Sequence, residues 1–275
     1  MKAKKKYRKE TAMASPHRDS ALTPLQIPGG RTLLIDNRIG VADAASTLVS
    51  FAKRGAEEGY TVISDLIQGE HDAHDIPRLH ICTLLRPGKH ANLAGVINAM
   101  GTLAASHAIE RNSDTRTQIR WLGDIHLERR RFTLFKTKRI ATVFSQSLLL
   151  PSGFLDYMIL HAVIDMPESR FPVRMVDAVT RIFTSRPVSN ADHLTHAFLH
   201  DFYGMYFAIP KEKEVRLSFW DEYIARSLLI GKRVRFRDGK KHRRGKAISV
   251  TPEGALVVLG RKGARYEITS QSALL

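Results

Sequence analysis

The sequence has little cysteine, since Cys82 is the single one among its 275 residues. One thiol excludes an internal disulfide and a zinc site built on thiolates. Long apolar runs are also missing, and none reaches the roughly 18 residues that a membrane-spanning helix needs. The basic start, MKAKKKYRKE, is not followed by the apolar stretch of a signal peptide. We therefore expect a cytoplasmic protein that does not enter a membrane.

Acidic residues are outnumbered, with 27 Asp and Glu against 43 Lys and Arg, and the formal net charge is +16. Such an excess of positive charge favours an anionic partner, and the candidates are a nucleic acid, an acidic protein and a phosphate-bearing ligand. No nucleic-acid recognition motif accompanies the charge, and mutual repulsion also keeps basic proteins in solution. With 43% hydrophobic residues, the chain can bury the core of one large domain, or of a large domain and a small one.

The pattern along the chain predicts an α+β fold. After a basic tail over residues 1–28, apolar periodicity predicts a strand at RTLLID, a helix at VADAASTLVSFAKRGA, strands at YTVISDL and LHICTLL, and a helix over 91–110. Four strand-like runs follow, TQIRW, RFTLFK, RIATVFSQSLLL and FLDYMILHAVID, and then three helices near 173–184, 190–207 and 214–229. Neighbouring strands in succession favour a mixed, largely antiparallel sheet with helices over strict alternation of strand and helix.

Residues 230–275 differ in character from the rest. The short runs KRVRFR, GKAISV, ALVVL and RYEIT, joined by tight turns such as TPEG, predict a small β-barrel. In KRVRFR, alternation puts the apolar residues on one face with Lys232, and three arginines on the other. One edge is therefore expected to be a basic surface, either solvated or in contact with an acidic protein or a nucleic-acid backbone. Its candidate residues are Lys232, Arg233, Arg235, Lys240, Lys241, Arg243 and Arg244.

Several strings resemble the biotin–protein ligases of the biotin/lipoate protein ligase superfamily. FWDEYIARSLLIGKRVRF followed by GKAISVTPEGALVVL resembles that family's join between the catalytic domain and its SH3-like β-barrel. RPVSNADHLTHAFLHDF resembles the helices before the join, while AKRGAEEGYTVISD and HICTLLRP resemble two early segments. The resemblance covers roughly residues 31–275, and it implies a ligase-like domain at 29–229 and an SH3-like domain at 230–275.

The resemblance also implies a reaction in two steps. Biotin or a related acid reacts with ATP, in the presence of Mg²⁺, to form an acyl-adenylate and pyrophosphate, and a carrier-protein lysine then attacks this mixed anhydride. The implied partner is a biotin carboxyl carrier or another acidic protein. Such a site needs cationic or N–H groups that hold phosphate, and a closing loop that keeps water from the intermediate.

The string Arg120-Trp-Leu-Gly-Asp124 stands where the family has KWPND. Trp121 and Asp124 match this motif, and Arg120 keeps the charge of the lysine with a different geometry. Gly123 lacks the amide of the asparagine. The resemblance implies that Arg120 and Asp124 are catalytic, and that Trp121 and Gly123 bind ligand.

The family's phosphate loop, of the form GRGRxGR, corresponds here to QGEHDAHDIPRLH. Only Gly69 and Arg78 match the pattern and are implied to bind ligand, whereas Glu70, Asp72 and Asp75 bring negative charge. Two like charges at 4 Å repel by about 4 kcal/mol at an effective dielectric of 20, so an acidic loop over an adenylate is costly unless a metal intervenes. The histidines of this segment match no metal-ligand spacing, and a solvated polar loop is expected.

Two further motifs are altered. KRIATVF replaces the family's KVAGIL-type strand, which puts Arg139 at the position of a catalytic lysine. A one-residue slip would put Lys138 there instead, so the resemblance implies Arg139 or Lys138 as the catalytic residue. HAVID replaces GIGIN, so that His161 and Val163 stand for glycines and Asp165 for the asparagine. The resemblance implies that His161 and Asp165 bind ligand, and the side chains of His161 and Val163, which stand for glycines, would intrude into a biotin or adenine pocket. On an apolar strand, His161 is also typical of a hydrogen-bonded core histidine.

Two interpretations follow. The first is a divergent biotin–protein ligase-like enzyme that activates biotin or a related acid, with reduced or changed activity. The second is a catalytically inactive relative that binds a protein or nucleic acid through its basic surfaces.

Overall fold

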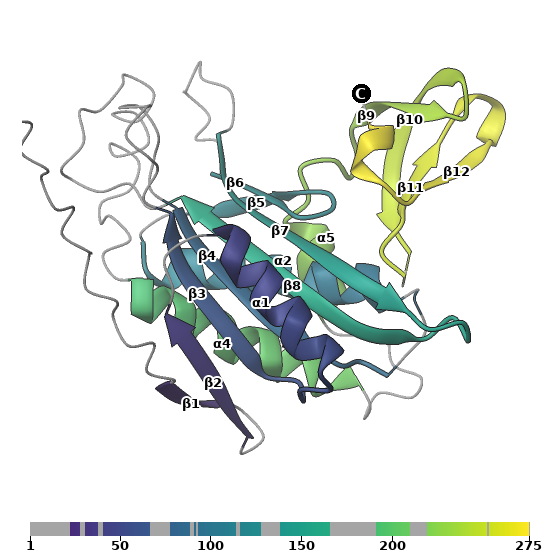
Figure 1. Cartoon of the computed structure of the whole chain (residues 1–275). Helices are drawn as coiled ribbons and strands as arrows, with labels where there is room; N and C mark the ends of the chain where they lie inside the picture. Colours follow the sequence, from purple (N-terminus) through teal and green to yellow (C-terminus); the bar gives the residue numbers. More distant parts are fainter. Residues whose placement is uncertain are drawn as a thin grey trace, which may run out of the picture.

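The computed structural model describes residues 23–27, 31–37, 41–66, 78–88, 91, 93–113, 116–127, 138–165, 191–209, 219–251 and 253–274. The predicted strand RFTLFK, the predicted helix at 173–184 and Gly69 lie outside these residues. Within them, the chain forms a large sheet with helices on both faces, followed by a second and smaller sheet (Figure 1).

The large sheet has eight strands in the order β1-β2-β3-β4-β8-β7-β6-β5. The ladder between β2 and β3 is parallel, and the other ladders of this sheet are antiparallel. The prediction of a mixed, largely antiparallel sheet is therefore confirmed. The strands are β1 (Thr23–Ile27), β2 (Arg31–Asn37), β3 (Tyr60–Leu66), β4 (Arg78–Leu85), β5 (Thr117–Arg120), β6 (Asp124–Leu127), β7 (Arg139–Leu149) and β8 (Leu155–Asp165).

Two predicted boundaries are wrong. The expected tail over 1–28 includes β1, which pairs antiparallel with β2 and satisfies its backbone hydrogen bonds there. The helix expected to continue to residue 229 is α5 (Phe219–Ala225), which ends four residues earlier. It ends there because the chain turns to pair with β5: the Ile119 N–H donates to the Arg226 carbonyl, and the Leu228 N–H donates to the Ile119 carbonyl, each at 2.8 Å.

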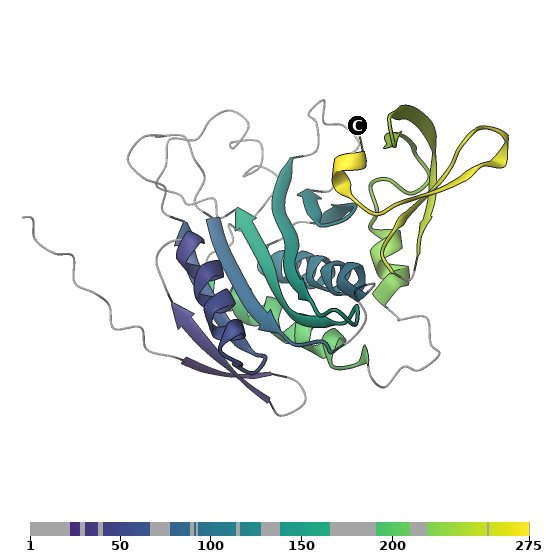
Figure 2. The ribbon, with the colours of Figure 1, turned by 45° about the vertical axis from the view of Figure 1, so that its right-hand side comes forward.

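Helices cover both faces of the large sheet (Figures 1 and 2). On one face lies α1 (Val41–Lys53), whose buried Ala44, Leu48 and Ala52 share a core with residues of β3, β4 and β8. On the other lie α2 (Leu93–Arg111) and α4 (Ala191–Tyr206), which with α5 enclose the larger core. No helix in the described ranges is long and apolar enough to cross a membrane.

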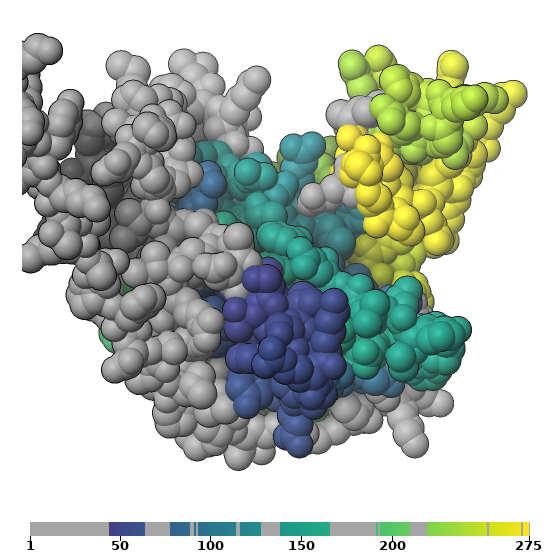
Figure 3. Space-filling view, viewed as in Figure 1, coloured from purple at the N-terminus to yellow at the C-terminus, as the bar shows by residue number. Residues whose placement is uncertain are grey.

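The second sheet has four antiparallel strands in the order β12-β11-β10-β9, and it forms a lobe beside the large sheet (Figure 3). Its ladders do not close into a barrel within residues 233–268, so the SH3-like barrel stays a prediction. One isolated bridge joins Phe236 of β9 to Leu274. The strands are β9 (Arg233–Asp238), β10 (Lys241–Val250), β11 (Leu256–Leu259) and β12 (Arg265–Ile268), with short 3-10 turns at Arg261–Gly263 and Gln271–Ala273.

Candidate functional site

Strand register brings several of the predicted site residues to one end of the large sheet. Arg78 at the start of β4 lies opposite Asp165 at the end of β8, and its Nε donates to Asp165 Oδ1 at 3.2 Å. These residues are 87 positions apart in sequence, and the antiparallel ladder between β4 and β8 makes them neighbours. Arg78 keeps 41% of its side chain exposed, so its guanidinium can still reach a ligand.

Asp124 and Arg139 meet at the same end. Asp124 begins β6, and its carboxylate accepts a hydrogen bond from Thr142 Oγ1 at 3.0 Å. Arg139 begins β7, and its Nη1 lies 3.6 Å from Asp124 Oδ1. The arginine side chain is 59% exposed and the aspartate only 17%, so the aspartate anchors a cation that still faces solvent.

Electrostatics join these two pairs into one cluster. Burial raises the pKa of Asp165, while the positive charges of Arg78, Lys138 and Arg139 oppose that rise without cancelling it. Lys138 therefore lies near enough to act on this carboxyl group. We call Arg78, Asp124, Lys138, Arg139 and Asp165 the sheet-end cluster; its three cations against two carboxylates leave one positive charge in excess when all are ionised.

Gly123 has a structural role that the sequence did not reveal. Its carbonyl accepts a hydrogen bond from the Val143 N–H at 2.9 Å, so the turn between β5 and β6 lies directly against β7. A Cβ atom at this position would lie 1.9 Å from the Val143 carbonyl oxygen, which is far inside van der Waals contact. The backbone therefore demands glycine, and an asparagine could not stand here without moving β7.

Trp121 and Arg120, which belong to the same motif as Gly123, have different surroundings: one is buried and the other is exposed. Trp121 is 1% exposed and packs in a core shared with Phe236, Leu256 and Val258 of the second sheet. Arg120 is exposed at the end of β5, opposite Asp124 in the ladder. The structure thus gives Trp121 a packing position between the two sheets and leaves Arg120 at the surface.

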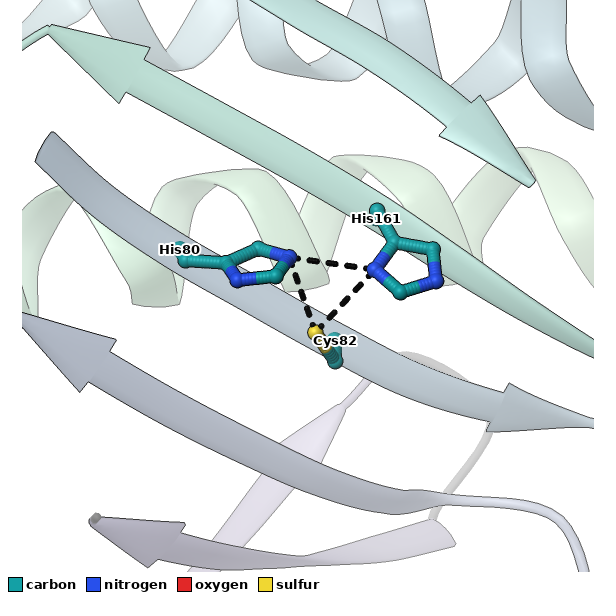
Figure 4. Close-up of side chains that lie close together, drawn as sticks. All are labelled: His80, Cys82 and His161. Carbon is teal, nitrogen blue, oxygen red and sulfur yellow. Dashed lines mark hydrogen bonds between the residues drawn. The ribbon is translucent and has the colours of Figure 1, made fainter. Parts of the chain in front are cut away.

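His161 belongs to a buried cluster with His80 and Cys82, shown in Figure 4. His80 Nε2 lies 3.0 Å from His161 Nδ1, and Cys82 Sγ lies 3.0 Å from the first nitrogen and 3.3 Å from the second. The His161 ring also stacks on Phe144 of β7, with centroids 4.5 Å apart. His161 is therefore a core histidine in contact with polar groups, as the sequence favoured.

All three groups of this cluster are uncharged at neutral pH. Burial lowers the pKa of His80 to about 4, and burial together with the neighbouring His80 lowers that of His161 to about 4. Burial raises the pKa of the Cys82 thiol to about 12. The prediction of a solvated polar loop over residues 68–80 is wrong at His80, which is buried in β4. Neither His80 nor Cys82 was predicted as a site residue, although a His-x-Cys spacing on a strand puts both side chains on one face.

The predicted basic surface lies on β9 and β10. Arg233, Arg235 and Arg237 are exposed while Phe236 is buried, which confirms the predicted alternation of β9. Arg235 stands directly opposite Arg244 in the ladder, an arrangement of like charges that costs stability. The structure places Lys232, Lys240, Lys241 and Arg244 at the surface, and Arg243 half-buried.

Arg243 differs from its neighbours because it has partners of its own. Its Nε donates to Asp238 Oδ2 at 2.6 Å, and its guanidinium lies over the Tyr266 ring, 5.1 Å from the ring centroid. It is therefore partly neutralised, and the rest of the basic surface carries the charge that faces solvent.

Comparison with known proteins shows which fold this is. The biotin protein ligase of Aquifex aeolicus superimposes over 83% of this chain and 93% of its own, with a TM-score of 0.59 and 19% identity. The fold is that of a biotin protein ligase. The Aquifex enzyme solved with biotin and ATP matches with a TM-score of 0.58, 17% identity and the same coverage. A biotin protein ligase-like protein of unknown function from a Silicibacter species matches over 90% of this chain and 96% of its own, with a TM-score of 0.65 and 12% identity.

The resemblance read from the motifs is thus confirmed at the level of the fold. No protein-family model matches the sequence, and no curated protein does. Since these structures share fewer than one residue in five with this chain, they describe the scaffold, and any chemistry depends on this chain's own side chains.

Proposed function

We propose that this protein is a divergent ligase-like enzyme that activates a carboxylic acid with ATP and transfers the acyl group to a carrier-protein lysine, with reduced or changed activity. The acid's carboxylate would attack the α-phosphate of ATP and release pyrophosphate. The lysine amine would then attack the acyl carbon and release AMP. The sheet-end cluster carries this proposal, because it gathers cations from β4 and β7 on the scaffold of a biotin protein ligase.

Within this proposal, Arg139 and Arg78 hold phosphate oxygens. Both guanidiniums are partly exposed, and each is positioned by a carboxylate that is less exposed than the arginine. Positive charge fixed before the reaction stabilises the charge that develops on a phosphate without reorganisation at that moment. Lys138 adds a third cation, and Asp124 and Asp165 would orient the cations rather than bind the substrate. Residues 68–77 of the phosphate loop, Gly69 among them, lie outside the described residues, and the effect of its acidic side chains on an adenylate stays a prediction.

The acid would differ from biotin or be held differently. His161 fills space on the α1 side of the sheet, where its ring packs against Phe144 and contacts His80 and Cys82. The motif resemblance implies a glycine at this position, which would leave that volume to the ligand. Biotin, lipoate and octanoate are therefore all reasonable acids to offer.

The experiment that tests the proposal is ATP–pyrophosphate exchange with each of these acids in the presence of Mg²⁺. We expect exchange with one of them, and a loss of about 100-fold in Arg139→Ala, the scale at which one charge-stabilising group is removed. Arg265→Ala is the matched control. Arg265 also begins a strand, is exposed, and pairs loosely with a carboxylate, Glu267, at 3.5 Å. An active protein that tolerates Arg139→Ala, or a cooperatively folded protein that exchanges with no acid, contradicts the proposal.

The second candidate is an inactive relative that binds an acidic protein, and the facing Arg235 and Arg244 favour it. Two arginines opposite each other in a ladder repel and lower stability, and an anionic partner bound over them would offset that repulsion. The solved structures give no support to a nucleic-acid partner. Reversing Lys240, Lys241 and Arg244 to Glu, with Arg243 kept for its pair with Asp238, should abolish salt-dependent binding to a biotin carboxyl carrier domain. Binding that survives both this reversal and raised salt excludes the second candidate.

A further inference from the structure

The His80, Cys82 and His161 side chains point three different donor atoms at one place. His80 and Cys82 lie on the same face of β4, and His161 reaches them from β8, where it stands opposite Cys82 in the ladder (Figure 4). The three ligand atoms lie within 4.8 Å of one another, and all three residues are buried. Imidazole nitrogen and thiolate sulfur are the ligands that soft and borderline metal ions prefer.

We propose that His80 Nε2, Cys82 Sγ and His161 Nδ1 form a three-coordinate site for monovalent copper. This inference goes beyond the proposed function and does not rest on it. The distances of 3.0 to 3.3 Å between the ligand atoms are close to those of a metal centre. In a three-coordinate centre with metal–ligand bonds of about 2.0–2.3 Å, ligand atoms stand roughly 3.5–3.7 Å apart, so the cluster would open by about 0.4–0.7 Å.

Charge selects the ion. The exposed fractions of His80, Cys82 and His161 are 1%, 0% and 2%, so the site lies in a low-dielectric interior where net charge is costly. Monovalent copper would replace the thiol proton, form the copper–sulfur bond and release that proton, which leaves the site neutral as before. A divalent zinc ion would leave one positive charge in the core.

Coordination number points the same way. Zinc sites in proteins are almost always four-coordinate, with a fourth protein ligand or a water. Within the described residues, the cluster offers three ligands, and His161 is covered on one side by the Phe144 ring. Soft thiolate ligands favour monovalent copper among the ions that imidazole also binds.

The hydrogen-bonding state of the rings is a second observation. His80 Nδ1 and His161 Nε2, the outward nitrogens, have no hydrogen-bond partner in the described part of the chain. If both inward nitrogens carried protons, these would repel across 3.0 Å, so in the neutral cluster one ring buries an N–H outward without an acceptor. Such a group costs about 1–3 kcal/mol. A bound metal ion would use the lone pairs of both inward nitrogens, and this gain would offset the cost of the unpaired outward N–H groups.

The test is a competition between the purified full chain and bicinchoninate, a chromophoric chelator of monovalent copper, without oxygen. We expect the protein to withdraw one equivalent, and Cys82→Ser and His161→Gln to weaken this at least 100-fold. The matched control is the double variant His196→Gln/His200→Gln, which removes two exposed histidines one turn apart on α4 and should keep the full equivalent. Zinc offered with its own chromophoric chelator should not bind comparably.

X-ray absorption on the copper-loaded wild-type protein decides the matter if the variants do not fold. We expect one sulfur and two nitrogen neighbours. A site of methionine sulfurs or of nitrogens alone overturns the proposal, as does a failure to withdraw copper, an equal withdrawal by Cys82→Ser, or a preference for zinc. The outcome of the copper experiments does not depend on whether the protein catalyses ATP–pyrophosphate exchange, so the two proposals are tested separately.

Discussion

Trp121 donates its indole Nε1–H to the backbone carbonyl of Gly254, 2.8 Å away, across 133 residues of sequence. The bond ties the turn after β5 to the turn between β10 and β11 of the second sheet. Helix α2 meets the same turn, since a Cβ atom on Gly95 would lie 2.1 Å from the Glu253 carbonyl oxygen. The large sheet, α2 and the second sheet therefore meet at this turn, and position 95 has room only for glycine.

We expect Trp121→Phe to lower the free energy of unfolding by about 1–2 kcal/mol more than Trp220→Phe does. Both substitutions remove the same indole area from a buried site, but Trp220 Nε1 has no hydrogen-bond partner in the described part of the chain. The difference is the cost of leaving the Gly254 carbonyl buried without its donor. Denaturant unfolding of both variants measures it, and equal losses would contradict the assigned bond.

Gly123→Ala should lower the free energy of unfolding by more than 2 kcal/mol, because its Cβ would overlap the Val143 carbonyl oxygen. The control is Gly204→Ala on α4, where an added Cβ meets nothing within 4 Å. Alanine is the better helix former by about 1 kcal/mol, so this control should raise stability. Gly123→Asn, which restores the residue of the ligase motif, is expected to be at least as damaging. A well-folded Gly123→Asn protein would show that the turn can move.

Arg226→Met should lower the free energy of unfolding by about 2–3 kcal/mol. The arginine donates to Glu110 and Glu222 at 2.7 Å each, and so joins α2 to α5. Removing it leaves two half-buried carboxylates without their shared partner, which costs more than the ion pairs themselves contribute. Arg265→Met is the comparison, because Arg265 and its partner Glu267 are 62% and 54% exposed, and this variant should lose less than about 1 kcal/mol. Thermal and denaturant unfolding give both values.

The same network predicts acid sensitivity. Burial alone would raise the pKa of Glu110, but hydrogen bonds from Arg226 and Thr117 outweigh it and hold the pKa below its ordinary value of 4.5. For Glu222, hydrogen bonds from His107 and Arg226 likewise outweigh burial. Each group binds its proton more readily in the unfolded chain, so its contribution is complete above pH 4.5 and is lost as pH falls through the lower folded pKa. Unfolding curves between pH 6 and 3 should show a smaller loss of stability in Arg226→Met than in the wild type. Parallel losses would contradict this.

Strands and helices could be predicted from the sequence where the spacing of apolar residues is regular and one face of the element is buried. In β9, Val234 and Phe236 alternate with three arginines, and the structure keeps that alternation. The helix predicted over 91–110 forms as α2, with its ends shifted by one or two residues. The end of α5 could not be predicted, since it depends on backbone bonds to Ile119, which lies more than 100 residues earlier in the sequence.

The sequence by itself determined the α+β class, the motif strings that resemble biotin protein ligases and the excess of positive charge. These are local or compositional properties. Only the tertiary structure decided that Arg78 meets Asp165, that Trp121 packs against the second sheet, and that His80 and Cys82 meet His161 across two strands. Each of these contacts depends on strand register, which is fixed by the packing of whole faces and cannot be read from any single segment.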